Sequence, residues 1–207
     1  MKIVNYTKGI YNKEFLETLF IENQIDYVIN CAAMKYIDTC EDFIRESIDV
    51  NLTGTLNIVD LSKKYKIKSL VHISTDKSNN ATSVYGCCKQ IAKKYVLKMG
   101  YNTYEGVNFW NSDGSFITHW KNNLELNNPI VLNNSKIMRY FSLIDDVVKD
   151  IKFALEDNKN SPIYKKNTFI LNNNSNNFEK IEEDILNNNN YLENDIHKFL
   201  QLANINI

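Results

Sequence analysis

The sequence contains little glycine, and its glycines are not spaced as phosphate-binding loops require. The six glycines are at positions 9, 54, 86, 100, 106 and 114. No two of the first five have the G-x-G or G-x-x-G spacing that brings backbone N–H groups against a pyrophosphate. The stretch 1–24 predicts only a short strand (2–6) and a helix (13–20), which is less than a complete mononucleotide-binding half. We therefore expect the first βαβ unit of a dinucleotide-binding fold to be missing.

Cysteine and histidine are also scarce, which argues against a metal site. The four cysteines include no C-x-x-C pair, and the three histidines are scattered at positions 72, 119 and 197. Neither a zinc site nor a disulfide framework is predicted. Cys31 follows an apolar stretch, so we expect it to be a reduced core residue.

The chain has neither an excess of one charge nor a long apolar run. With 24 basic and 25 acidic residues the net charge is -1, which favours neither nucleic acid nor an anionic membrane surface as a partner. No apolar run approaches the roughly 20 residues that cross a bilayer, so a cytoplasmic protein is expected. The 43% hydrophobic content suffices for one compact core. We expect this core in residues 1–157, followed by an asparagine-rich, partly helical segment in 158–207.

The middle of the chain alternates β-rich runs with helical patterns. Strands are predicted at 26–31, 69–74 and 104–109, and helices at 45–64, 84–99 and 115–126. A further helix is expected after Ser142, which suits an N-cap. This alternation indicates an α/β fold, a Rossmann-like and mostly parallel sheet with helices on both faces. Without the first βαβ unit, one sheet edge and an apolar face should be open for a second copy or a complementing chain.

Tyr85 and Lys89 form a Tyr-x-x-x-Lys pair at the start of the helix predicted at 84–99. Residues four apart share one face of a helix. A nearby ammonium favours the phenolate, so we expect Lys89 to lower the pKa of Tyr85 and make it a usable base.

The surrounding residues resemble the catalytic segment of UDP-N-acetylglucosamine 4,6-dehydratases of capsular-polysaccharide biosynthesis, in the extended short-chain dehydrogenase/reductase family. The matching segments, in family order, are Cys31-Ala32-Ala33-Met34-Lys35-Tyr36-Ile37-Asp38-Thr39-Cys40-Glu41-Asp42, Asp49-Val50-Asn51-Leu52-Thr53-Gly54-Thr55, Ile73-Ser74-Thr75-Asp76-Lys77, Tyr85-Gly86-x-x-Lys89, Asp113-Gly114-Ser115 and Met138-Arg139-Tyr140-Phe141. The resemblance extends over roughly residues 26–155. Several motifs in order are more specific than any one of them.

The resemblance implies a redox-neutral elimination on a nucleotide sugar. Tyr85 would take the proton of the C4 hydroxyl, with support from Lys89, and Lys77 would remove the C5 proton. Asp76 would protonate the leaving C6 hydroxyl, and Thr75 would hydrogen-bond the C4 oxygen. A lysine acts as a base near neutral pH only if its pKa is lowered, so we expect Lys77 to be buried beside Lys89.

The resemblance also implies NAD or NADP as cofactor and a UDP-sugar as substrate. The cofactor would lie against Ala32, Ala33 and Ser74, together with Tyr85 and Lys89. Because the glycine-rich loop is absent from the sequence, we expect weak dinucleotide binding and an impaired enzyme.

The substrate would be bound by Lys35, Asn108 and Arg139, since a guanidinium can hold phosphate oxygens with two hydrogen bonds. Glu105 and Asp113 depart from the family pattern, because basic residues are expected at both positions. Two added carboxylates should repel a diphosphate.

Two further interpretations stay open from the sequence. A non-catalytic remnant, or a scaffold that binds a partner, fits the absent glycine loop. A sugar-nucleotide epimerase or reductase fits Tyr85 and Lys89 equally well, but it gives Asp76 and Lys77 no function.

Overall fold

The chain forms two compact units. The computed structural model describes residues 8–110, 112–129, 138–156, 162–164 and 169–172. The first unit comprises residues 1–106 and 148–164, and the second comprises 107–147 and 165–207. The strand predicted at 2–6 and the boundary predicted at 157 lie outside the described residues, as does nearly all of the segment 158–207.

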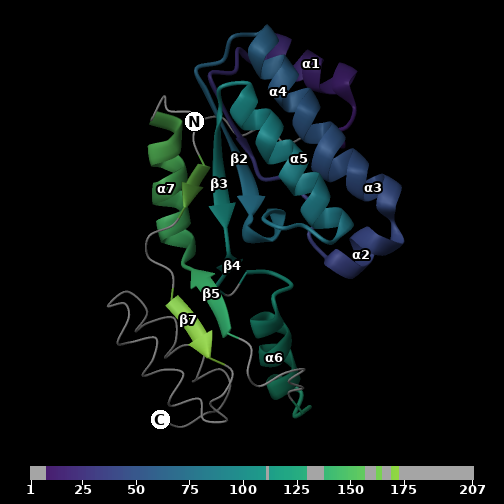
Figure 1. Cartoon of the computed structure of the whole chain (residues 1–207), viewed down its shortest axis with the longest axis vertical. Coiled ribbons are helices and arrows are strands. Elements are labelled where there is room, and N and C mark those ends of the chain that lie inside the picture. Colours follow the sequence, from purple (N-terminus) through teal and green to yellow (C-terminus); the bar gives the residue numbers. More distant parts are fainter. Residues whose placement is uncertain (1–7, 111, 130–137, 157–161, 165–168, 173–207) are drawn as a thin grey trace. The chain divides into compact units, whose positions relative to one another are not determined.

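Helices and strands alternate through the first unit and continue into the second (Figure 1). The helical elements are α1 (Lys13–Asn23), α2 (Ile37–Asp42), α3 (Ile44–Ile48), the π-helical turn η1 (Asp49–Thr53), α4 (Gly54–Lys64), the 3-10 turn η2 (Asp76–Ser78), α5 (Val84–Lys98), α6 (Phe116–Glu125) and α7 (Ile144–Glu156). The strands are β1 (Tyr27–Asn30), β2 (Ser69–Thr75), β3 (Asn102–Gly106), β4 (Asn108–Phe109), β5 (Met138–Ser142), β6 (Pro162–Tyr164) and β7 (Phe169–Asn172).

The sheet of the first unit is parallel throughout its described strands, in the order β1-β2-β3-β6. Helices α4 and α5 cover one face, and Figure 1 shows α7 on the other side of the strands. The predicted α/β class with helices on both faces is therefore confirmed. Within the described part of the chain β1 pairs only with β2, and its residues Tyr27 and Ile29 are 53% and 48% exposed. This edge of the sheet is unpaired among the described residues, and because the segment 1–7 lies outside them, the open edge expected from the sequence stays a prediction.

The core of the first unit lies between this sheet and the helices α1, α4 and α5. Its buried members are Leu16, Phe20, Ile58, Val59, Leu61, Ile67, Leu70, Val96 and Tyr101. They come from the apolar faces of the helices, from β2, which is buried along nearly its whole length, and from the connections that hold Ile67 and Tyr101. A parallel strand covered on both faces is expected to be largely apolar, and in β2 Leu70, Val71 and Ile73 are apolar while the buried His72 is not.

A π-helical turn interrupts the helix that the sequence predicts at 45–64. Asn51 within it is fully buried, and its side chain accepts from the Met34 N–H at 3.0 Å and donates to the Met34 carbonyl at 3.1 Å. It also donates to Ser47 Oγ at 3.2 Å. The wider π turn thus brings an amide against the backbone of the loop after β1. Such turns occur often at functional sites.

Three expectations about local structure are wrong. The strand predicted at 104–109 is divided at Val107, so that β3 and β4 belong to different sheets. Ser142 ends β5 instead of capping α7, and its buried hydroxyl has no partner among the described residues. Cys31 is exposed, because it follows the last residue of the edge strand.

The second unit contains a small sheet in the order β4-β5-β7 and the helix α6. β4 and β5 are parallel, while β5 and β7 are antiparallel. Trp110 and Phe141 pack edge to face, with ring centroids 5.4 Å apart. Among the described helices of both units, none has the length and apolar content needed to cross a membrane.

Candidate functional site

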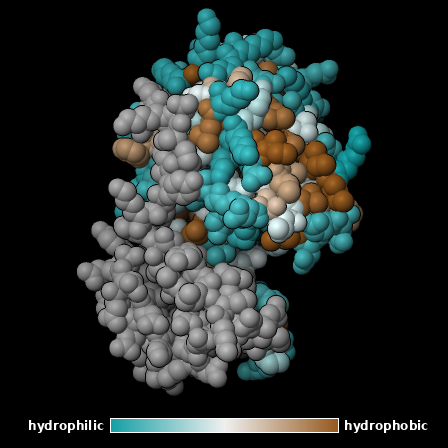
Figure 2. Space-filling view, in the orientation of Figure 1, coloured by the Kyte–Doolittle hydropathy of each residue, from teal (hydrophilic) through white to brown (hydrophobic). Residues whose placement is uncertain are grey.

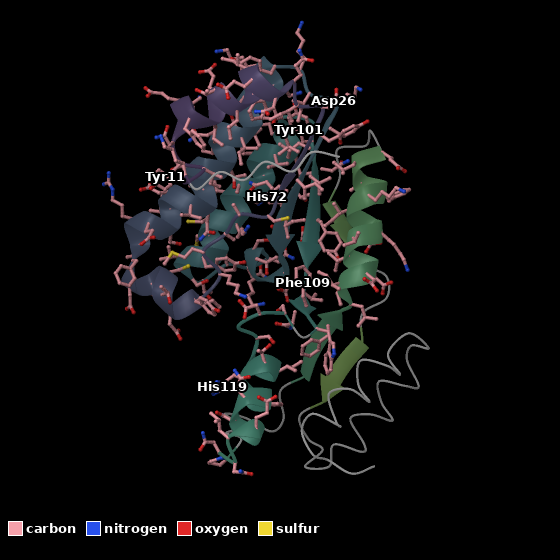
Figure 3. All side chains as sticks on the ribbon, turned by 180° about the vertical axis from the view of Figure 1, so that it is seen from behind. Tyr11, Asp26, His72, Tyr101, Phe109 and His119 are labelled. Carbon is pink, nitrogen blue, oxygen red and sulfur yellow. The ribbon has the colours of Figure 1, made fainter. Side chains whose placement is uncertain are left out.

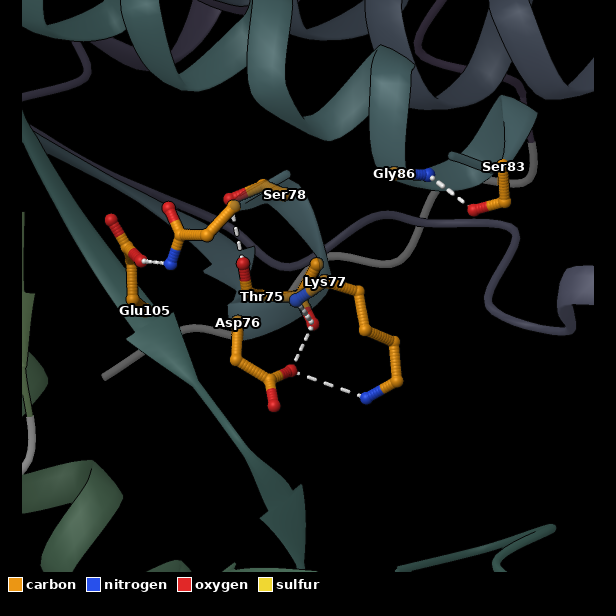
Figure 4. Close-up of polar contacts among 8 residues, drawn as sticks. Thr75, Asp76, Lys77, Ser78, Ser83, Gly86 and Glu105 are labelled. Carbon is orange, nitrogen blue, oxygen red and sulfur yellow. Dashed lines mark hydrogen bonds and ion pairs between the residues drawn. The ribbon is translucent and has the colours of Figure 1, made fainter. Parts of the chain in front are cut away.

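The candidate site is built on the turn that follows β2. Thr75 ends the strand, and its hydroxyl accepts from the Lys77 N–H at 3.4 Å and donates to Asp76 Oδ1 at 3.0 Å. Ser78 Oγ donates to the Thr75 carbonyl at 2.7 Å. Lys77 Nζ lies 3.2 Å from Asp76 Oδ1 (Figure 4). The turn therefore presents a carboxylate and an ammonium in contact at the carboxyl end of a central strand, where ligands bind in open α/β sheets.

The start of α5 lies directly against this turn. Ser83 Oγ caps the helix by accepting from the Gly86 N–H at 3.1 Å, and Glu41 accepts from the Val84 N–H at 2.7 Å. A Cβ on Gly86 would lie 2.7 Å from the Lys77 carbonyl oxygen. Glycine is needed here because the helix and the turn approach each other so closely.

Tyr85 and Lys89 are both buried on α5, at 8% and 2% exposure. Burial raises the pKa of Tyr85 to about 12, while a hydrogen bond with the Thr75 side chain acts in the opposite direction. Burial also lowers the pKa of Lys89 from 10.5 to about 8. Lys89 Nζ donates to the Ile73 carbonyl at 2.8 Å. The expected lowering of the Tyr85 pKa is therefore wrong for this structure, because removal from water outweighs the other influences.

Lys77 does not have the buried environment that we expect for a base. Its side chain is 42% exposed and that of Asp76 is 44% exposed. The two form a partly solvated ion pair, and the expectation that Lys77 is buried beside Lys89 is wrong for this structure.

The loop after β1 contributes the small residues predicted on the cofactor side. Ala32 is half-buried and its N–H donates to Asn30 Oδ1 at 3.3 Å, while Ala33 is exposed. Lys35 is exposed, with its ammonium 5.3 Å from the Tyr36 ring centroid. This loop and the Asp76–Ser78 turn follow neighbouring parallel strands, so they lie at the same edge of the sheet.

The other predicted substrate residues belong to the second unit. Asn108 is in β4, half-buried and paired with Phe141 of β5. Arg139 is in β5, paired with Leu171 of β7, and its side chain lies outside the described residues. The structure thus divides the predicted site residues between the two units.

Sequence reasoning missed two buried polar groupings in the first unit. His72 lies within β2 (Figure 3), with Nδ1 3.1 Å from Asn30 Nδ2, and Asn30 Nδ2 also donates to Thr55 Oγ1 at 3.1 Å. Burial holds the pKa of His72 well below its ordinary value, and the nearby Lys89 charge adds to this effect. The position of His72 in a β-branched run is the only signal of burial that the sequence offers.

Glu105 belongs to the second missed grouping, and its surroundings correct an expectation. Its carboxylate is 1% exposed, with Lys93 Nζ at 2.8 Å and Asn79 Nδ2 at 2.9 Å. The negative charge is matched inside the first unit. Glu105 is therefore not the repulsive group that the sequence predicts near a diphosphate.

The donor set fits one half of a nicotinamide dinucleotide. Tyr85 offers a hydroxyl and Lys89 a buried amine, and the half-buried Ala32 and exposed Ala33 after β1 present only small side chains. The hydroxyl of Ser74 is buried with no partner in the described part of the chain. No glycine loop is present in the sequence to bind the pyrophosphate half.

Known proteins similar to this chain include enzymes that act on nucleotide sugars. The Staphylococcus aureus capsular polysaccharide biosynthesis protein CapD is 31% identical over 153 residues, which are 70% of this chain and 26% of CapD. UDP-glucose 4-epimerase of Rickettsia canadensis is 27% identical over 149 residues, 68% of this chain and 44% of that enzyme. The uncharacterized membrane protein MJ1061 of Methanocaldococcus jannaschii is 28% identical over 137 residues, 61% of this chain and 40% of that protein. The chain thus spans less than half the length of these curated relatives.

Solved structures show the same fold. Pen from Bacillus thuringiensis has a TM-score of 0.78 at 21% identity, with 87% of this chain and 59% of that chain covered. UDP-glucose 4-epimerase from Thermotoga maritima, solved with UDP-glucose, has a TM-score of 0.74 at 17% identity, with 86% and 67% covered. The family described as polysaccharide biosynthesis protein matches residues 1–200. Since that match includes nearly the whole sequence, this chain belongs to the polysaccharide biosynthesis protein family, with the Rossmann-type fold of nucleotide-sugar-modifying enzymes.

Proposed function

We propose that this chain provides the catalytic segment of an NAD(P)-dependent nucleotide-sugar 4,6-dehydratase, a lyase acting on a UDP-N-acetylglucosamine-type substrate in polysaccharide biosynthesis. The observation that supports this best is the contact between Asp76 and Lys77 on a turn beside Tyr85. An acid and a base on adjacent residues suit the removal of water across two adjacent carbons. A simpler oxidoreductase of this fold needs only the tyrosine and the lysine on α5.

Each side chain has one step in the proposed reaction. Tyr85 takes the proton of the C4 hydroxyl, and Thr75 orients the C4 oxygen. Lys77 removes the C5 proton, while Asp76 delivers a proton to the C6 hydroxyl, which leaves as water. A bound nicotinamide would supply the reversible hydride acceptance that a redox-neutral elimination requires. Lys89 and the alanines after β1 would hold it.

The electrostatics indicate what substrate binding must change. With a pKa of about 12 the Tyr85 phenol is neutral at pH 7 and donates, so it needs added positive charge nearby to act as a base. Asp76 and Lys77 are partly solvated, and a bound sugar would exclude water from their contact. A proton-bearing carboxyl beside a neutral amine is the state that the elimination uses.

The test is turnover of UDP-N-acetylglucosamine with NAD or NADP, followed by mass spectrometry. Loss of one water from the sugar nucleotide, with deuterium from D2O incorporated at C5, is the expected result. Lys77→Met should abolish C5 exchange while the circular dichroism spectrum stays unchanged, and Lys94→Met on the exposed face of α5 is the control. Normal C5 exchange in Lys77→Met would remove that residue from the role of base. Absence of both turnover and dinucleotide binding up to millimolar concentration would overturn the proposal.

A UDP-glucose 4-epimerase is the second candidate, because curated relatives with that name match this chain. An epimerase requires Tyr85 and Lys89 but leaves Asp76 and Lys77 without a role in catalysis. The same assay separates the two functions, since an epimerised product keeps the mass of the substrate. A non-catalytic scaffold would produce neither product and would still bind a UDP-sugar or a partner chain.

The open edge at β1 also supports pairing with a second copy or with a complementing chain. A parallel strand with two large apolar residues half exposed is suited to receive another strand and the layer beyond it. A monomeric mass by light scattering at micromolar concentration would contradict self-association.

A further inference from the structure

Three side chains from three different elements bond to one another in a closed ring beside the candidate site. Lys93 Nζ, from α5, donates to Glu105 Oε1 at 2.8 Å and to Asn79 Oδ1 at 2.9 Å. Asn79 Nδ2, from the residue after η2, donates to Glu105 Oε2 at 2.9 Å. Figure 4 shows the carboxylate of Glu105, from β3, approaching the turn on the side away from the Asp76–Lys77 contact.

The ion pair within the ring is buried, while Asn79, its third member, is exposed. The Glu105 side chain is 1% exposed and that of Lys93 is 12% exposed. A buried ion pair is favourable only if the remaining polar atoms are also bonded, which Asn79 accomplishes here. Lys93 can only donate, Glu105 can only accept, and the Asn79 amide does both. Each pair in the ring is therefore complementary, and a neutral amide in place of the Glu105 carboxylate leaves two donors facing each other.

The ring joins the turn that contains Asp76 to the helix that contains Tyr85. The backbone N–H of Asn79 donates to the Asp76 carbonyl at 3.0 Å, which ties Asn79 to the turn. The side chain of Asn79 bonds to Lys93 and Glu105, so it connects the end of that turn to the ion pair. Lys93 follows Tyr85 by eight residues and Lys89 by four, which places the three on neighbouring positions of one helical face. The face turns by about 40° for each four residues. Because of this rotation, Lys89 faces β2 and bonds to the Ile73 carbonyl, while Lys93 faces β3 and bonds to the Glu105 carboxylate.

We propose that Asn79, Lys93 and Glu105 are positioning residues that hold the Asp76–Lys77 turn at a fixed distance and orientation from Tyr85. This assignment rests on the proposed dehydratase function for its catalytic meaning. Its structural part, a turn held by the ring, can be tested without turnover.

Hydrogen exchange of the peptide that contains residues 76–79 is the first test. Asn79→Ala leaves the ion pair in place and removes both bonds to it, so exchange in the turn should become about 5- to 10-fold faster, as expected for the loss of one or two hydrogen bonds. Glu105→Gln should act similarly. The double variant Lys93→Glu with Glu105→Lys restores a donor-only and an acceptor-only side chain, and a flipped Asn79 amide can close the ring again. It should return exchange toward the wild-type rate.

The control is Val96→Ala, which removes a fully buried core side chain of the same helix without touching the ring. This substitution lowers overall stability, but the ratio of the hydrogen-exchange rate in the turn to the rate in the rest of the unit should stay as in the wild type. Unchanged exchange in Asn79→Ala would overturn the proposal. A charge-swapped variant that folds but exchanges as fast as Glu105→Gln would also overturn it.

Kinetics give the second readout. In active enzyme, Asn79→Ala should lower kcat by roughly 10- to 100-fold while the KM for the UDP-sugar changes less than about 2-fold, because misplacement of reacting groups acts on the chemical step. A loss confined to KM would contradict a positioning role. If the wild-type chain shows neither turnover nor dinucleotide binding, the dehydratase proposal fails while the exchange result still decides whether the ring holds the turn.

Discussion

Replacement of Lys89 by methionine should change how stability depends on pH. Lys89 is buried, and its pKa falls from 10.5 in an exposed lysine to about 8 in the folded chain. Between these values the unfolded chain binds a proton that the folded chain lacks, so stability rises with pH. Between pH 7 and pH 9 the increase in the free energy of unfolding from this one group is about 1.3 kcal/mol. In Lys89→Met this increase should disappear.

The measurement is urea denaturation, followed by far-ultraviolet circular dichroism at pH 7, 8 and 9 with a reductant to keep the thiols reduced. The difference between wild type and variant at each pH isolates Lys89 from groups that both proteins share. Lys68→Met is the control, because Lys68 forms a solvent-exposed pair with Asp26 and that variant should follow the wild type. Equal pH slopes for wild type and Lys89→Met would refute the reasoning, and would mean that the buried ammonium is solvated better than its burial indicates.

Three other substitutions test separate features of the site. Because the pKa of His72 is lowered in the folded chain, the unfolded chain binds a proton at a higher pH than the folded chain does. The free energy of unfolding should therefore fall by about 1.4 kcal/mol per pH unit below pH 6.5. His72→Gln should make this fall smaller in urea denaturation at acid pH. Gly86→Ala places a Cβ 2.7 Å from the Lys77 carbonyl, and should cost about 1–3 kcal/mol by urea denaturation although alanine favours helices. Glu41→Gln weakens the charged cap on the Val84 N–H, and should cost about 0.5–1 kcal/mol, less at high salt.

Each of these predictions has a matched control on an exposed position. His119 on α6 is exposed, so His119→Gln should leave the acid slope as in the wild type. Lys94→Ala on α5 and Glu46→Gln on α3 should each stay within about 0.5 kcal/mol of the wild type. An acid slope unchanged in His72→Gln, or a Gly86→Ala chain as stable as its control, would contradict the burial and the close approach described above.

The elements around the site could be predicted because local pattern and tertiary environment agree there. The run Ser69–Thr75 is β-branched and buried, and the helix from Val84 begins where a serine can cap it. The division of the strand at Val107 could not be predicted, because the run from Tyr104 to Phe109 suits a strand of either sheet. The π turn at Asp49–Thr53 could not be predicted either, since it depends on the hydrogen bonds of Asn51 to a loop distant in sequence.

The titration behaviour of the site was the least predictable feature, because it depends on depth of burial and not on spacing. Lys89 and Lys93 are one turn apart on the same helix, and both are largely removed from water. Lys93 has a buried carboxylate at 2.8 Å, so its positive charge is matched. Lys89 donates to the Ile73 carbonyl, a neutral acceptor, and its pKa is lowered to about 8. A motif that records only Tyr-x-x-x-Lys therefore cannot say whether its lysine is a fixed cation or a titrating amine. Burial decides that for Lys89, and the packing of α5 against the sheet provides the burial.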